Sequence, residues 1–265
     1  MNHCAFCGPT HAPMSPEDVL SRWMSKELRK RFKGSLFEQY KYSSRIGTEP
    51  TERKQRLALD APVVCRPCNN DWMSRIDKLA KPILNPLITS PHVARTLSAE
   101  QCGILASWMT MKSIVLDRLG FAQHGQRAVS FRPFECSRFK TTHIPPSRVT
   151  VWIGRFDPER PIRGHVRAIY YDQLNLKRLS NLYAFVCTMR LDELAIQLIA
   201  LRPKLSGSRI PHSIPFATYP TEGTWAERFI ELWPNLPDSI AWPTPRSLGG
   251  QRALNAVANR LDGRF

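Results

Sequence analysis

The sequence predicts an α+β fold, in which a cysteine-paired N-terminal module and several helices precede a C-terminal antiparallel sheet. Two Cys-x-x-Cys pairs lie near the start of the 265-residue chain. Apolar side chains then recur at helical spacing as far as residue 119, and strand-like segments follow from residue 149. We therefore expect two parts, residues 1–85 and residues 86–265.

The segment that follows the first cysteine pair has the pattern of a helix start. Residues 15–18, Ser-Pro-Glu-Asp, combine a capping serine, an early proline and acidic side chains at the positive end of a helix dipole. Gly34 is a suitable end for this helix. We expect an amphipathic helix whose apolar side contains Leu20, Trp23, Met24 and Leu28.

The stretch before the second cysteine pair lacks a sustained period. Residues 34–60 are polar and basic, and we expect a long loop or weak strands there. Residues 61–64 are expected to form a short strand that leads into the pair. A helix is then predicted from Asn69 to about Pro82.

The longest helical pattern spans residues 98–119, and Ser98 with Gln101 is suited to cap its start. The short separation between the last two strand-like segments predicts an antiparallel hairpin. Short helices are expected around residues 225–233 and over residues 249–265. The predicted strands are residues 149–153, 165–171, 184–189 and 194–200.

The charge of the chain favours a polyanionic partner. It contains 38 Lys and Arg against 22 Asp and Glu, a net charge of +16, and the excess is dense between residues 22 and 56. Each cation placed on a phosphate releases counterions, so this distribution predicts a nucleic acid as the partner. The alternative is a charge that serves solubility alone.

No pattern predicts a membrane-bound or secreted protein. No uncharged apolar run approaches the roughly 20 residues that span a bilayer. The first residues lack the charged and then apolar layout of a secretory signal. The odd total of seven cysteines argues against a disulfide framework and favours a reducing compartment. We expect a cytoplasmic protein that has no membrane partner.

The two cysteine pairs predict a structural zinc site. Cys4, Cys7, Cys65 and Cys68 supply four thiolates, and the two-residue gap in each pair lets both sulfurs face one ion. Formation of such a site can return on the order of 10 kcal/mol. The alternative is a redox-active pair, but such a pair usually occurs singly beside a βαβ pattern, which is absent here. The remaining cysteines are expected to be buried hydrophobic residues: Cys102, Cys136 and Cys187.

The order of motifs resembles the HNH endonucleases that carry two zinc knuckles. Their pattern is CxxC, an acidic-His-Val-x-Pro motif, an Asn, and a CxxC followed by Asn or His that opens a helix. Cys4/Cys7, Val19, Cys65/Cys68 and Asn69 match it in order. The resemblance covers about residues 1–85 and implies a ββα-metal module.

The resemblance also implies a catalytic divalent cation, Mg²⁺ or Mn²⁺, separate from the zinc. Glu17 and Asn69 are its candidate ligands, because their oxygen atoms suit these cations. Asp18 occupies the position of the family's general-base His, and Asp60 is the best counterpart of the middle Asn. Ser21 replaces the family's Pro.

Asp18 is the most consequential departure from the family. Imidazole titrates near neutrality and is suited to accept a proton from water, whereas a carboxylate with a pKa near 4 is a weaker base unless burial raises that pKa. Asp18 would then act as a weak base or as a second metal ligand. The alternative for both Glu17 and Asp18 is that they are ordinary residues of a helix start.

The sequence therefore predicts a metal-dependent, HNH-like endonuclease that hydrolyses DNA phosphodiester bonds and contains a structural zinc. The alternatives are a catalytically inactive protein that binds nucleic acid, and a subunit whose C-terminal sheet docks a protein partner or a second copy. DNA is favoured over RNA as the nucleic acid. The expected phosphate contacts come from Arg22, Lys26, Arg29, Lys30 and Lys33.

Overall fold

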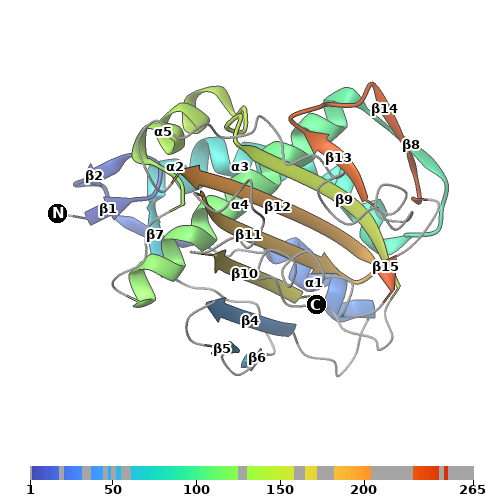
Figure 1. The fold of residues 1–265 in the computed structure, drawn as a ribbon, viewed down its shortest axis with the longest axis horizontal. Coiled ribbons are helices and arrows are strands. Elements are labelled where there is room, and N and C mark those ends of the chain that lie inside the picture. The colour runs from blue at the N-terminus through green and yellow to red at the C-terminus, as the bar shows by residue number, and fades with distance from the viewer. Residues whose placement is uncertain are drawn as a thin grey trace.

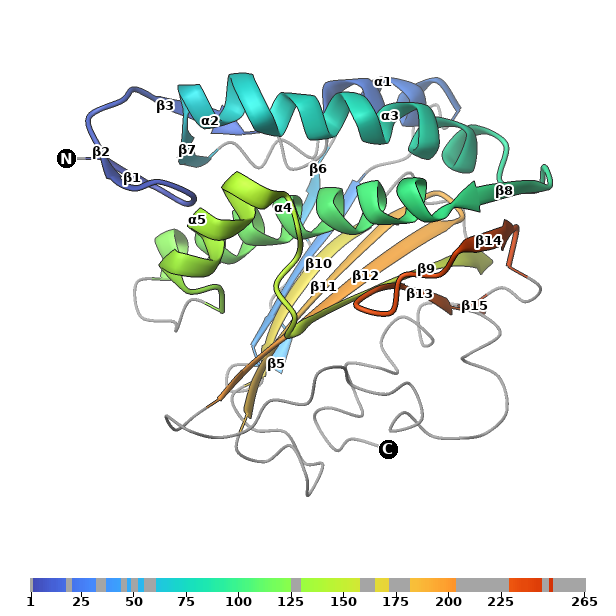
Figure 2. The ribbon, with the colours of Figure 1, turned by 90° about the horizontal axis from the view of Figure 1, so that it is seen from above.

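The computed structural model describes residues 2–17, 21–31, 37–43, 47–48, 52–54, 61–124, 130–157, 165–171, 182–203, 229–244 and 248–249. Its helices and one large sheet form three layers (Figures 1 and 2). An outer layer contains α1 (Arg22–Arg31) and α3 (Ser74–Thr89), and a central layer contains α4 (Ala99–His124). The sheet packs on the other side of α4, so this helix forms the centre of the core.

The sheet contains the predicted C-terminal strands and part of the basic N-terminal stretch. Among the described residues it has nine strands, in the order β13-β9-β12-β11-β10-β4-β5, with β15 paired to β9 and β6 paired to β4. The predicted hairpin is confirmed, because β11 and β12 pair antiparallel around Asp192 and Glu193. The strands are β4 (Phe37–Ser43), β5 (Gly47–Thr48), β6 (Glu52–Lys54), β9 (Val149–Asp157), β10 (His165–Tyr171), β11 (Leu182–Leu191), β12 (Leu194–Pro203), β13 (Phe229–Trp233) and β15 (Leu248–Gly249).

Two details of the sheet differ from the sequence prediction. β4 pairs in parallel with β10, so the sheet is mixed rather than purely antiparallel. The helix predicted around residues 225–233 is wrong for residues 229–233, which form β13 and pair with β9. Pairing with β9 outweighs the local helical preference there. Residues 225–228 and 250–265 lie outside the described residues.

The central helix α4 is buried on nearly all sides, because α3 covers one side and the large sheet covers the other. Trp108, Met111 and Val115 are fully buried in it. Its predicted cap is confirmed: the Ser98 backbone N–H donates to Gln101 Oε1 over 3.0 Å, and the Gln101 N–H donates to Ser98 Oγ over 3.3 Å. A short sheet of β8 (Arg95–Ser98) and β14 (Ser239–Trp242) precedes the helix. The next helix, α5, spans Pro133–Thr142.

The helix that follows the second cysteine pair is longer than predicted. It begins as α2 (Arg66–Cys68), widens into the π-helical turn η1 (Asn69–Met73) and continues as α3. The expected stop near Pro82 is wrong, because α3 includes Pro82 and Pro86 and ends at Thr89. Each proline removes one helical hydrogen bond. Burial of four apolar side chains outweighs that loss: Ile83, Leu84, Leu87 and Ile88.

The segment predicted to start a helix at Ser15 forms a strand instead. β3 (Met14–Glu17) pairs antiparallel with β7 (Ala61–Cys65), and Ser15 lies opposite Val64. The helix α1 begins only at Arg22. Pairing with β7 supplies the backbone hydrogen bonds that a helical turn would have supplied. A second small hairpin, β1 (Asn2–Cys4) with β2 (Gly8–Thr10), contains the first cysteine pair.

The described helices include none that is both long enough and apolar enough to cross a bilayer. The division into residues 1–85 and 86–265 stays a prediction. Residue 85 lies within α3, and β4 of the first part pairs with β10 of the second.

Candidate metal centre

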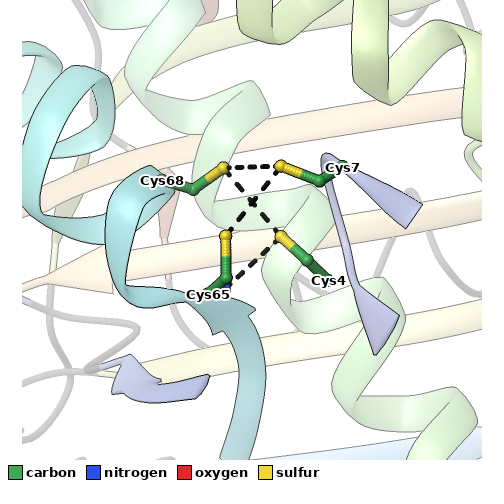
Figure 3. A group of neighbouring side chains, drawn as sticks. All are labelled: Cys4, Cys7, Cys65 and Cys68. Carbon is green, nitrogen blue, oxygen red and sulfur yellow. Dashed lines mark hydrogen bonds between the residues drawn. The ribbon is translucent and has the colours of Figure 1, made fainter. Parts of the chain in front are cut away.

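A short hairpin (β1–β2), the strand pair β3–β7 and a helix start bring the four predicted cysteines together (Figure 3). Cys4 ends β1, and Cys7 lies in the turn before β2. Cys65 ends β7, and Cys68 ends α2. The β1–β2 hairpin and the β3–β7 strand pair are joined through the backbone, because the Ala5 N–H donates to the Val63 carbonyl oxygen over 2.8 Å. This contact fixes the first pair against the second across the intervening chain.

The sulfur positions fit a tetrahedral ion. The four Sγ atoms lie within 4.8 Å of one another. The distances are 3.9 Å for Cys4–Cys68, 3.9 Å for Cys7–Cys65 and 3.2 Å for Cys7–Cys68. Tetrahedral zinc, with Zn–S bonds of about 2.3 Å, requires sulfurs about 3.8 Å apart. The predicted ligand set is therefore brought together, and it suits zinc.

The thiols need a cation to ionise together. The hydrogen bond between Cys4 and Cys68 lowers the pKa of Cys4 to about 4. The same hydrogen bond, together with burial, raises the pKa of Cys68. Burial also raises the pKa of Cys65. Neighbouring thiolates repel one another, so the cluster by itself keeps some of its protons. A divalent ion removes that obstacle and lets all four sulfurs bind as thiolates.

Aromatic side chains surround the cluster and connect it to α5. Trp72 contacts Phe6 and Phe139 edge-on, with ring centroids 4.8 and 5.9 Å apart, and stacks on His143 at 5.6 Å. Lys140 Nζ lies 3.2 Å from Cys7 Sγ. These contacts could not be predicted from the sequence, because residues more than 60 positions apart leave no local pattern.

The segments that contain the candidate cation ligands, Asn69 and Glu17, lie next to the cysteine cluster. Asn69 opens η1 immediately after Cys68, and its Nδ2 donates a hydrogen bond to Ser15 Oγ over 2.9 Å. Ser15 lies on β3, which ends at Glu17. The backbone therefore brings Asn69 to the strand that contains Glu17. Asp18 and Asp60 lie outside the described residues.

A second contact fixes the far end of this acidic segment to the same helix. Ser21 Oγ donates to Asp77 Oδ1 over 2.7 Å. The same carboxylate accepts hydrogen bonds from Trp108 Nε1 over 2.8 Å and from Lys112 Nζ over 3.1 Å. Residues 15 and 21 are thus both bonded to the η1–α3 helix, on either side of the acidic residues. Asp77 was not predicted, because its partners Ser21, Trp108 and Lys112 lie 31 to 56 positions away along the chain.

Four of the five predicted basic residues, Arg22, Lys26, Arg29 and Lys30, lie on α1, beside α3. Arg22, Lys26 and Lys30 are exposed, and Lys30 pairs with Glu27 over 2.9 Å. The side chain of Arg29 and all of Lys33 lie outside the described residues. α3 adds exposed cations that the sequence analysis did not single out, Lys78 and Lys81.

A contact between side chains of α1 and α3 joins the exposed cations of the two helices into one surface. Lys81 Nζ lies 5.8 Å above the centre of the Trp23 ring of α1. We call the exposed cations of both helices the basic surface: Arg22, Lys26, Lys30, Lys78 and Lys81. Figure 2 shows α1 and α3 together in the outer layer.

Comparisons of this chain with protein-family models, with curated proteins and with solved structures found no match.

Proposed function

We propose that this protein is a metal-dependent, HNH-like endonuclease that hydrolyses phosphodiester bonds in DNA, with zinc in a structural role. The observation that carries the proposal is a strand–strand–helix unit attached to the cysteine cluster. Its strands are β3 and β7, and its helix contains Asn69 as the first residue of η1, just after α2. The hydrogen bond from Asn69 to Ser15 joins the helix start to the strand that ends at Glu17. An endonuclease of this class needs its ligands from these two elements.

The donor set suits a hard cation. Asn69 donates through Nδ2, so its amide oxygen keeps its lone pairs available to Mg²⁺ or Mn²⁺. Glu17, Asp18 and Asp60 add carboxylates to this part of the chain. When bound, the cation stabilises the charge that develops on the scissile phosphate. Asp18 accepts the proton of the attacking water, as the residue at the general-base position.

The basic surface supports nucleic acid as the substrate. It contains cations from two helices, and the same η1–α3 helix contains Asn69 at its start. Phosphates that contact Lys78 and Lys81 would extend along this helix from the proposed cation site. Such contacts position the backbone of a nucleic acid and carry no sequence information.

Cleavage of supercoiled plasmid in Mg²⁺ or Mn²⁺ tests the proposed activity. We expect Asn69→Ala to slow nicking at least about tenfold, because a cation ligand is lost. Asp18→His should accelerate it on the order of a hundredfold at neutral pH, because imidazole is a better base there. Asn70→Ala, at the exposed neighbouring position, is the matched control and should leave the rate unchanged. Absence of nicking in both the wild type and Asp18→His would contradict the proposal.

The departure at Asp18 specifically favours a second candidate function, a nucleic-acid-binding protein without cleavage activity. Its carboxylate is poorly matched to proton abstraction near neutral pH. The Asp18→His variant separates the two candidates. If it cleaves while the wild type only binds, the chain has the architecture of the enzyme and has lost the base.

Binding that depends on the basic surface should weaken steeply with salt. We expect Lys26→Gln, on α1, and Lys78→Gln, on α3, each to reduce the slope of log affinity against log salt by about 0.9, because each removes one phosphate contact. The measurement is fluorescence anisotropy of a labelled DNA duplex over a salt series. Arg138→Gln, an exposed cation on α5, should leave the slope unchanged. Salt-independent binding would contradict both candidate functions.

A further inference from the structure

The four cysteines of the cluster differ in their access to solvent. Cys4, Cys65 and Cys68 are at most 1% exposed, whereas Cys7 is exposed. Reagents in solution therefore reach the cluster at Cys7 first. Its nearest sulfur among the hydrogen-bonded pairs is that of Cys68, at 3.2 Å. The accessible sulfur of Cys7 and a second sulfur that can react with it, that of Cys68, are thus already in contact.

Lys140 is the cation beside this accessible sulfur. Its Nζ donates to Cys7 Sγ over 3.2 Å, from the last turn of α5. Zinc bound by four thiolates carries a net negative charge, and the ammonium offsets part of it. A hydrogen bond to sulfur also withdraws electron density, and the nucleophilicity of a thiolate falls with its basicity. Lys140 therefore both stabilises the loaded site and slows attack by Cys7.

We propose that Cys7 is a modification site for hydroperoxides, with Cys68 as the resolving thiolate, and that its oxidation releases the zinc. The Cys7 thiolate attacks one peroxide oxygen, so that an S–O bond forms and the O–O bond breaks. Hydroxide, or an alkoxide from an organic hydroperoxide, leaves and takes a proton from the acid form of the buffer. The product at Cys7 is a sulfenic acid.

The Cys68 thiolate then attacks the Cys7 sulfur. A disulfide forms, the S–O bond breaks, and the departing hydroxide is protonated to water. Together the two thiolates lose two electrons, and one peroxide is reduced. Cys4 and Cys65 remain as the only two ligands of the four, which is too few to hold the ion, so Zn²⁺ dissociates.

The consequence reaches beyond the cysteines because of what packs on them. Trp72 connects the cluster to Phe139 and His143 at the end of α5. The residue after Cys68 is Asn69, the start of the helix used by the proposed function. Peroxide would thus loosen the part of the molecule next to the proposed cation site. The inference itself depends on the zinc site and not on nucleic-acid cleavage.

The test treats the full, zinc-loaded chain with hydrogen peroxide. Zinc release is followed with a chromogenic chelator, and disulfides are located by peptide mass spectrometry. We expect one zinc released per chain together with a Cys7–Cys68 disulfide. The Lys140→Gln variant should form this disulfide faster than the wild type, by about threefold for each tenfold increase in the basicity constant of the Cys7 sulfur. The Lys140→Arg variant should keep the wild-type rate. Cys102→Ala, at a buried cysteine outside the cluster, should also react as wild type.

Several results would overturn the inference. A first disulfide between Cys4 and Cys7 would exclude Cys68 as the resolving residue, and first oxidation at another cysteine would exclude Cys7. A Lys140→Gln rate equal to that of the wild type would exclude the control by Lys140. Because the readouts are zinc and disulfides, these outcomes leave the proposed nuclease function to be judged by its own experiment.

Discussion

Removal of zinc, or replacement of Cys68 by serine, is expected to unfold the N-terminal module. The expected loss is on the order of 10 kcal/mol, because formation of a four-thiolate zinc site supplies that much folding free energy. A whole domain is usually stable by about 5–15 kcal/mol, so little would remain. The two strand pairs beside the cysteines, β1–β2 and β3–β7, contain only short strands of three to five residues. Thermal unfolding followed by circular dichroism, with and without a chelator, measures the effect.

The matched control for this substitution is Cys102→Ala. Cys102 is also fully buried, but it lies on α4, outside the cluster. We expect this variant to lose roughly 1 kcal/mol, as is typical for removal of a small buried group, and to keep one zinc per chain. Elemental analysis of the purified protein provides the independent check. A metal-free protein whose melting temperature is unchanged by chelators would contradict the prediction.

The parts of the molecule that could be predicted from sequence are those defined by local spacing. The two-residue gap in each cysteine pair is itself the geometry of a zinc ligand pair, so Cys4, Cys7, Cys65 and Cys68 could be assigned without a structure. The helical period of α4 and the strand patterns of β9 to β12 are likewise local. Burial of the side chains that form the pattern stabilises α4, β9, β11 and β12.

The parts that could not be predicted depend on partners distant in the sequence. Ser15 has the local features of a helix cap, yet β7 is available to pair with it, and a strand forms. β4 has no apolar alternation of its own and is placed by its parallel pairing with β10. At the site, Lys140 contacts Cys7, which is 133 positions away in the sequence. Asp77 contacts Ser21, which is 56 positions away. No spacing rule connects such residues, so tertiary structure is needed to find them.

Asp77→Ala should destabilise the protein by about 3–5 kcal/mol, because it removes a carboxylate that faces a buried ammonium. Lys112 Nζ lies 3.1 Å from Asp77 Oδ2, and the Lys112 side chain is 0% exposed, whereas that of Asp77 is 22% exposed. The two substitutions should therefore differ. Lys112→Met leaves a carboxylate that reaches water and keeps its bonds from Ser21 and Trp108, so we expect it to cost less.

Urea unfolding of Asp77→Ala, Lys112→Met and the double variant measures this asymmetry. The double variant should recover part of the loss of Asp77→Ala, because no buried charge is then left without the partner it had. Equal costs for both single variants would contradict the prediction. Asp77 also fixes Ser21, at the far end of the acidic segment, to α3. Asp77→Asn retains the shape of the side chain. If the segment from Ser15 to Ser21 holds the proposed cation, this variant should therefore slow nicking by more than its loss of folded protein accounts for.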